Sequence, residues 1–298
     1  MKAILLSAGA AVALAAATAT PAFARSGPEV EIEHAVARVV VIVEDRADVA
    51  VEIEQGSSRL PPLRVTRRGD DIRVDGGLTR RFAGVRIGDV IGECRSGPDR
   101  TRPGEGASVN VRNIGRVEHN DAPLIVVRSP RAVQLEAGGA VFGSIGRGAA
   151  SVDLDAHGCG DWIVANTDGP VSASSAGSGD IVVGTSRSLD VDLSGSGNVI
   201  AGATGAFDVS IAGSGGATVA EVNGETDISI AGSGEVAVRR GRAPDLDISI
   251  AGSGDVDFGG VAGDVSISIA GSGDVRVAEA TGSVSRSVAG SGDIRIGR

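Results

Sequence analysis

A glycine-serine-glycine phrase that returns about every 19 residues constrains this chain more than any other feature. Its first glycines lie at successive spacings of 18, 18, 19, 20, 19 and 19 residues. A degenerate copy, Gly158-Cys159-Gly160, precedes them, and Gly138-Gly139 would begin a ninth. A fixed period of this length indicates units that stack on one another, each too small to bury its own apolar face. The glycines of the seven regular turns are Gly177, Gly179, Gly195, Gly197, Gly213, Gly215, Gly232, Gly234, Gly252, Gly254, Gly271, Gly273, Gly290 and Gly292.

Apolar and polar residues alternate on both sides of each turn, as in Ile228-Ser229-Ile230 before Gly232 and Val236 and Val238 after it. A period of two indicates β-strands. Near-identical strands that recur every 19 residues favour a parallel β-helix of eight to nine rungs, in which each strand lies in register on its copy below. A leucine-rich repeat needs a leucine framework and an asparagine column that are missing here, and a propeller blade needs about forty residues. We assign residues 106–298 to this coil.

The first half lacks the phrase and is expected to form a small β-strand cap over residues 25–105. Valine-rich or alternating segments at 39–43, 49–54, 63–66 and 72–74 are predicted to be antiparallel strands, with Arg68-Gly69-Asp70 at a turn. A cap would cover the first rung, whose backbone edge would otherwise be free to pair with another chain.

Residues 1–24 predict a secretory signal peptide, because Lys2 precedes an apolar stretch that ends before Ala22-Phe23-Ala24. The mature chain is expected to leave through the Sec pathway for the periplasm or the cell exterior, without a transmembrane anchor. It would carry 27 Arg against 38 Asp and Glu, which makes nucleic acid an unfavourable partner. An oxidising compartment allows Cys94 and Cys159 to form a structural disulfide; two unrelated buried thiols are the alternative.

The residue after each turn is acidic in most copies and would form a surface column that includes Asp255, Asp274 and Asp293. Like charges about 4.8 Å apart repel, and bound Ca²⁺ would relieve this, but a solvated acidic face is the interpretation we favour. The cluster His157, Cys159 and Asp161 supplies too few ligands for a metal site in one turn. His34 and His119 have no partner that the sequence identifies. We therefore expect no catalytic residue, no cofactor and no resident metal.

The run of D-I-S-I-A-G-S-G-D-V phrases in residues 150–298, with a valine-rich segment before it, resembles the auto-transporter adhesin, head GIN domain family. The resemblance implies a right-handed parallel β-helix in an exported bacterial protein with an adhesive or surface-binding role, and it brings no catalytic residues. We expect a non-enzymatic adhesin or structural envelope protein with an unidentified surface or envelope ligand. A β-helix polysaccharide lyase or hydrolase and a calcium-binding repeat protein are the alternatives. With five Phe, one Trp and no Tyr, the chain is poor in the aromatic platforms that sugar-cleaving sites use.

Overall fold

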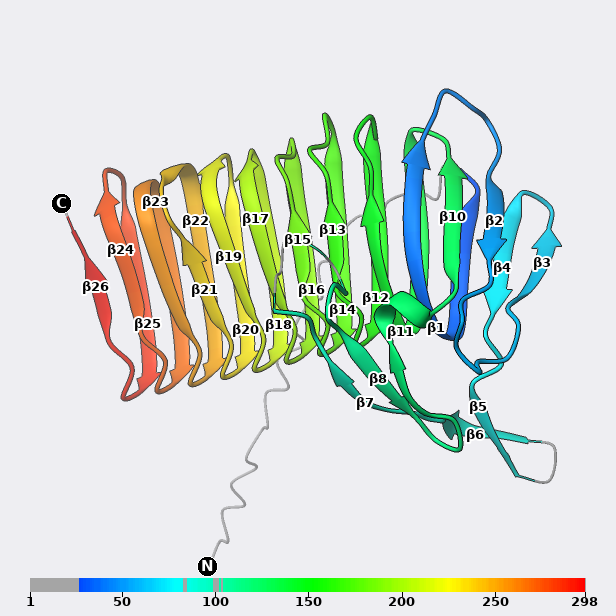
Figure 1. Cartoon of the computed structure of the whole chain (residues 1–298). Helices are drawn as coiled ribbons and strands as arrows, with labels where there is room; N and C mark the ends of the chain where they lie inside the picture. The colour runs from blue at the N-terminus through cyan, green and yellow to red at the C-terminus, as the bar shows by residue number, and fades with distance from the viewer. Residues whose placement is uncertain (1–26, 83–84, 99–101, 103, 298) are drawn as a thin grey trace, which may run out of the picture.

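The computed structural model describes residues 27–82, 85–98, 102 and 104–297, and it is built almost entirely of β-strands. Most of them stack side by side along one axis, from β1 (Glu29–Val43) near one end to β26 (Ile294–Ile296) at the other (Figure 1). This is the parallel β-helix predicted from the repeat, with about nine turns and a period of about 19 residues.

Each turn of the coil contributes two main strands on either side of the glycine corner. The first face holds the strands that lead into the corner glycine: β11 (Ala132–Ile145), β12 (Ser151–Gly158), β14 (Pro170–Gly177), β16 (Ser188–Gly195), β18 (Ala206–Gly213), β20 (Thr226–Gly232), β22 (Gly241–Gly252) and β25 (Val284–Gly290). The second face holds β13 (Trp162–Val164), β15 (Ile181–Val183), β17 (Asn198–Thr204), β19 (Gly216–Asn223), β21 (Glu235–Val238), β24 (Val275–Ala280) and β26. The long β23 (Asp255–Gly271) runs from the second face of one turn to the first face of the next. β11 continues past Gly139 onto the second face in the same way.

The register keeps equivalent residues in straight columns. Gly213, Gly232, Gly252 and Gly271 lie one above another, and so do the isoleucines at 228, 248 and 267. These isoleucines are at most 3% exposed, because every second side chain of a strand points into the coil. Trp162, Phe207 and Phe258 fill the same interior. Period-two alternation thus places the apolar core inside the coil and serine and aspartate outside.

The coil starts earlier than the repeat phrase does. β1 runs parallel to β11, with Val30 opposite Leu135 and Val39 opposite Gly143, and it also runs parallel to β4 (Asp71–Asp75) and β10 (Leu124–Ser129). The prediction that the strands of residues 30–75 are antiparallel was therefore wrong for the pairing of β1 with β4. It holds for β3 (Arg64–Arg68), which pairs antiparallel with β4 around Gly69, and β2 (Ala50–Glu54) pairs antiparallel with β10.

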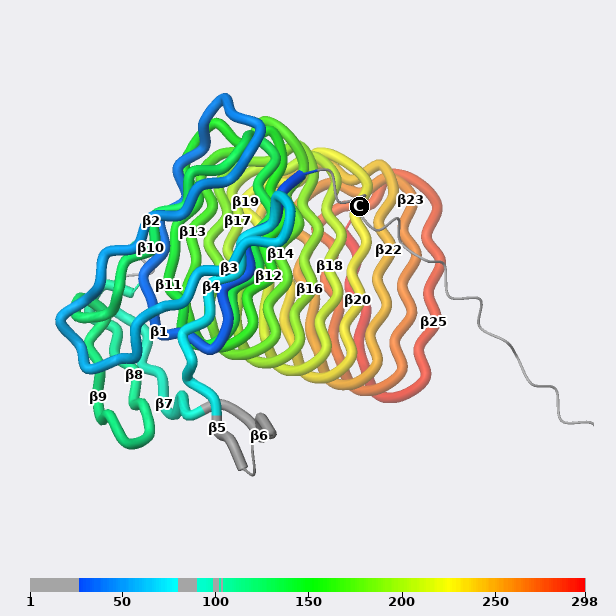
Figure 2. Tube along the Cα trace, turned by 90° about the vertical axis from the view of Figure 1, so that its right-hand side faces the viewer, coloured from blue at the N-terminus to red at the C-terminus, as the bar shows by residue number. Residues whose placement is uncertain are grey.

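Residues 44–131 fold back over the first rung and beside it. β5 (Thr79–Phe82) and β6 (Val85–Asp89) form a hairpin, and β7 (Ile91–Arg95), β8 (Ser108–Val111) and β9 (Gly115–Glu118) form a small separate sheet. A short 3-10 turn, η1 (His119–Asp121), leads from β9 to β10. Figure 2 shows β7, β8 and β9 projecting from the side of the coil near its N-terminal end. The buried Val109, Val111 and Val117 pack with Ala140 and Phe142 of β11 in a second hydrophobic cluster.

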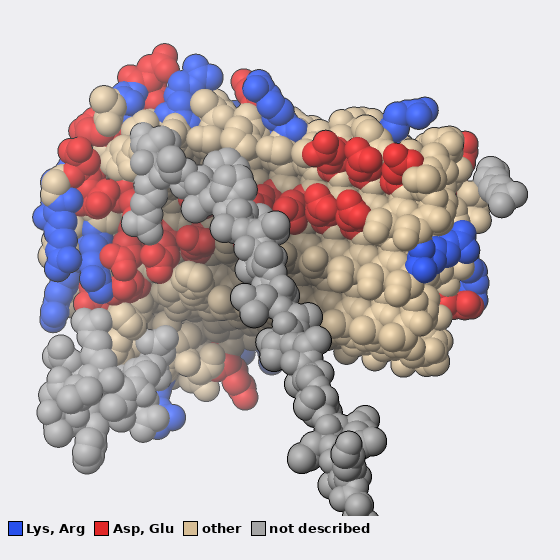
Figure 3. Space-filling view, turned by 180° about the vertical axis from the view of Figure 1, so that it is seen from behind, with Lys and Arg blue, Asp and Glu red and all other residues tan. Residues whose placement is uncertain are grey.

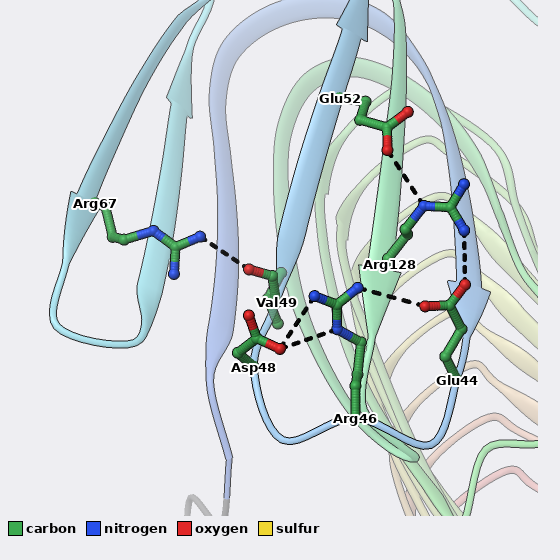
Figure 4. A network of polar contacts seen from close by, with 7 residues as sticks. All are labelled: Glu44, Arg46, Asp48, Val49, Glu52, Arg67 and Arg128. Atoms are coloured by element: carbon green, nitrogen blue, oxygen red, sulfur yellow. Dashed lines mark hydrogen bonds and ion pairs between the residues drawn. The ribbon is translucent and has the colours of Figure 1, made fainter.

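Ion pairs join the folded-back strands to the coil (Figure 4). Arg128 of β10 lies 2.6 Å from Glu44 at the end of β1 and 3.3 Å from Glu52 of β2. Arg46 pairs with Glu44 and Asp48, while an Arg67 guanidinium N–H donates to the carbonyl of Val49. Because these charges are partly exposed, each pair contributes little alone, but together they fix the position of β2 and β3.

Candidate ligand groove between cap and coil

A groove of 810 Å³ opens where the η1 turn meets the first rungs of the coil. Its floor comes from outward-facing side chains of strands on the second face: Val40 of β1, Leu124 of β10 and Ile163 of β13. Val40 is 38% exposed, unusually high for a large apolar side chain of this protein. The walls include Arg38 of β1, Phe142 of β11, and His119 and Asn120 of η1. Concave, mainly apolar sites with a few convergent polar groups are typical of ligand-binding sites.

Arg38 is the charged group of this groove that has no countercharge. Its Nε donates to the carbonyl of Ala122 at 3.1 Å, and no carboxylate pairs with it among the described residues. The β1 strand places it there, because Arg38 lies opposite Phe142 of β11 and Leu124 of β10, between the cap and the coil. A half-buried guanidinium that keeps unused N–H donors attracts an anion.

His119 forms the wall beside Arg38. Its ring meets Phe142 edge-to-face, with centroids 5.3 Å apart and an interplanar angle of 87°. Its Nδ1 atom is buried and has no hydrogen-bond partner in the described part of the chain. Burial lowers the pKa of His119 and the Arg38 charge adds to this, against a partial rise from the Asn120 side chain. The imidazole is therefore neutral at pH 7.

The side chains that line the groove suit ligand binding better than acid-base catalysis. Among its described lining residues the one carboxylate is Glu105, which pairs with Arg102 at 3.1 Å. Glycoside hydrolysis needs two carboxyl groups facing one bond. The groove supplies a cation, a neutral imidazole and an aliphatic floor.

The predicted acidic column lies on the coil, away from the groove, and its carboxylates have a structural task. Asp255 accepts the backbone N–H of Asp274 at 2.8 Å, and Asp274 accepts that of Asp293 at 2.9 Å. Each aspartate thus satisfies the backbone of the next rung, and Arg295 pairs with Asp293 at 2.9 Å. No group of three His, Cys, Asp or Glu side chains in the described residues is arranged to hold a metal ion.

Cys94 and Cys159 form a disulfide, with Cα atoms 6.1 Å apart. It joins β7 of the cap to the degenerate corner of the coil, so Cys159 is not a free thiol. The other members of the His-x-Cys-x-Asp cluster point elsewhere: His157 lies 3.8 Å from Glu136, and Asp161 accepts the backbone N–H of Asp180. The turn glycines occupy the corners as predicted from their spacing.

A second group of titratable residues lies on the outer face of β1 and β4. Arg73 of β4 contacts Glu33 and lies 3.6 Å from Glu31. A hydrogen bond to Glu33 and burial raise the pKa of Glu31 to about 7. His34 lies 3.5 Å from Glu33 and 3.6 Å from Asp75. The group holds β4 against β1.

The groove was not predicted from the sequence, in which His119 stood out only as a histidine without an identified partner. Arg38 interrupts an otherwise apolar run from Ala35 to Val43, and that interruption was the signal available. Its closeness to His119 depends on the long connection that brings η1 back to β1. The predicted signal peptide, residues 1–24, lies outside the described residues. No helix among the residues that the structure describes is long and apolar enough to cross a membrane.

The comparisons with known proteins agree with this architecture. No curated protein matches the chain. The last rungs of the coil carry the family signal, in the same segment where the D-I-S-I-A-G-S-G-D-V phrase is most regular. The resemblance noted in the sequence is thereby confirmed for this segment: residues 201–297 match the family described as "Putative auto-transporter adhesin, head GIN domain".

Proposed function

We propose that this protein is an exported, adhesin-like binding protein that holds a surface or envelope ligand in the groove between cap and coil and catalyses no reaction. The family match supports an adhesive role, and the predicted signal peptide supports export. The coil serves as a stiff support, because every rung is joined to the next by a continuous parallel ladder.

The groove is the observation that carries this proposal. Its volume of 810 Å³ lies within the range of small-ligand sites, and it combines an exposed aliphatic floor with the unpaired Arg38. The first face of the coil, by contrast, presents repeated small or charged side chains in columns. Binding at the groove would leave the coil free to set the distance between the ligand and the cell envelope.

Binding of the fluorescently labelled mature chain, residues 25–298, to bacterial cells and to isolated envelope tests this proposal. Ile163→Asp places a carboxylate in the groove floor and should abolish binding. Thr218→Asp is the matched control, because Thr218 occupies the same outward column two rungs beyond Val182 and lies outside the groove. Equal binding by both variants would remove the groove from the proposal.

Assays of polysaccharide cleavage test the proposal that the protein catalyses no reaction. Incubation with acidic and neutral polysaccharides should release no reducing ends and no unsaturated products. Turnover that co-purifies with the protein and disappears in the Ile163→Asp variant would overturn this part of the proposal.

A further inference from the structure

The unpaired Arg38 limits what the groove can bind. A partly desolvated cation without a countercharge is unfavourable, and the other groove cation, Arg102, already has Glu105 as its partner. Arg38 also cannot turn away freely, because its Nε donates to the carbonyl of Ala122. Its remaining N–H groups therefore have a fixed location in which to receive an anionic oxygen.

Two uncharged polar groups lie beside this guanidinium. The neutral His119 ring lines the groove, and the Asn120 amide follows it on η1. A planar carboxylate can accept two hydrogen bonds from one guanidinium and further ones from neighbouring donors. The polar end of the groove thus matches a carboxylate better than a neutral hydroxyl or a cation.

The other end of the groove is aliphatic. Val40 and Leu124 flank Arg38, and Ile163 continues the floor. The same outward column continues on the following rungs with Val182 and Ile200, each directly opposite its neighbour. A ligand that reaches from Arg38 along this column would bury aliphatic groups at a repeat of about 4.8 Å.

We propose that the groove binds an acidic, aliphatic peptide segment, with a side-chain carboxylate on Arg38 and an adjacent aliphatic side chain on Val40, Leu124 and Ile163. A sugar acid would satisfy Arg38 equally, but sugar rings favour exposed aromatic faces. Phe142, the one aromatic lining residue besides His119, is 2% exposed. The peptide assignment rests on the proposed binding function and specifies the ligand for the same groove.

Two synthetic peptides test the assignment on the unmodified mature protein. One alternates leucine with aspartate over six residues, and the other replaces every aspartate by asparagine. Fluorescence anisotropy at low ionic strength should show at least about tenfold weaker binding of the asparagine peptide, because charge-assisted hydrogen bonds are lost. Added salt should weaken the aspartate peptide far more than the asparagine peptide.

Substitutions test whether Arg38 causes the difference in affinity between the two peptides. Arg38→Gln should bring the two peptides to equal affinity, whereas Arg187→Gln removes an exposed arginine that does not line the groove and should change neither affinity. The melting temperature of each variant shows whether Arg38→Gln also disturbs the fold, and the comparison of the two peptides on the unmodified protein is independent of that question.

Three results would overturn the peptide assignment. The first is equal affinity for the two peptides on the unmodified protein, and the second is discrimination that survives Arg38→Gln in a folded variant. The third is Arg38-dependent binding of an oligogalacturonate that exceeds binding of the aspartate peptide, which would identify an acidic sugar instead. The proposed function is tested separately, by the loss of cell binding in the Ile163→Asp variant. The peptide assignment can therefore fail while the proposed function stands.

Discussion

The corner glycines are required for two separate physical reasons. Gly252 has φ +137°, a conformation that side chains with a Cβ rarely adopt, and a Cβ built there would collide with the carbonyl oxygen of Gly232 on the rung below. Gly69, in the β3–β4 turn, also has positive φ, at +62°, but nothing lies within 4 Å of its Cβ position. Of the two, only Gly252 combines backbone strain with a steric clash.

We expect Gly252→Ala to lower the free energy of unfolding by about 3 kcal/mol or more, and Gly69→Ala by only about 1 kcal/mol. Chemical denaturation of both variants measures the difference. If both substitutions lower the free energy of unfolding by the same amount, backbone strain alone explains why glycine is required at the corner. Close stacking of the corners would then not be the reason.

A row of aspartates on the first face of the coil carries unfavourable charge (Figure 3). Asp190, Asp208 and Asp227 lie in register on successive rungs. Burial, followed by repulsion from Asp208, raises the pKa of Asp190 to about 6. The folded state therefore binds the proton more tightly than the unfolded state, so this carboxyl destabilises the fold once it is ionised. Its stabilising protonated form is fully present below about pH 4 and is lost as the pH rises through about 6.

Asp190→Asn should accordingly stabilise the protein at pH 8 by about 1 kcal/mol, a value reduced for the partial exposure of the group, and by less at pH 5. Unfolding midpoints at the two pH values check this. Asp264→Asn is the control, because hydrogen bonds from Ser283 lower the pKa of Asp264 and this charge is favourable in the fold. An equal gain for both variants would contradict the explanation.

At the level of elements, the disulfide holds the β7–β8–β9 sheet to the coil. The bond closes a separation of 65 residues, and bonds of this kind typically contribute about 2–4 kcal/mol. Reduction should lower the melting temperature and speed tryptic cleavage after Arg95, Arg112 and Arg116, whose side chains are already exposed, because the small sheet then unfolds more readily, while the coil stays resistant. Non-reducing mass spectrometry of the exported protein should find the Cys94 and Cys159 peptides joined. Two free thiols, or unchanged proteolysis after reduction, would contradict this.

The elements also show where sequence reasoning succeeds and where it fails. The coil strands could be predicted because alternation and a glycine corner repeat together. β1 could not, because Ala35 stands opposite Gly139 in the corner column and no glycine-serine-glycine phrase marks that rung. The parallel pairing of β1 with β4 is also unrecognisable locally, since its partners, such as Val30 and Ile72, lie 42 positions apart in the chain. The groove depends on the same long-range return, and its residues therefore remained hidden.

At the scale of the whole molecule, the coil is a one-dimensional stack in which each turn contacts mainly its two neighbours. Removing residues 233–252 deletes one full repeat and joins Gly232 to Ser253. Gly232 is then again followed by a serine, and the next strand keeps its register with the rung below. The removed turn contributes inward side chains such as Val236, Leu246 and Ile248, and its neighbours present equivalent apolar columns to each other.

We expect the protein without residues 233–252 to fold cooperatively with a modestly lower melting temperature and to retain ligand binding, because the groove lies at the other end. Removing only residues 233–242 would set the Gly252 corner against the middle of a strand and should prevent folding of the last rungs. Circular dichroism, thermal unfolding and limited proteolysis distinguish the two. If both shortened chains unfold alike, long-range cooperativity would govern the stability of the coil. If both fold alike, the fixed period would not determine the register.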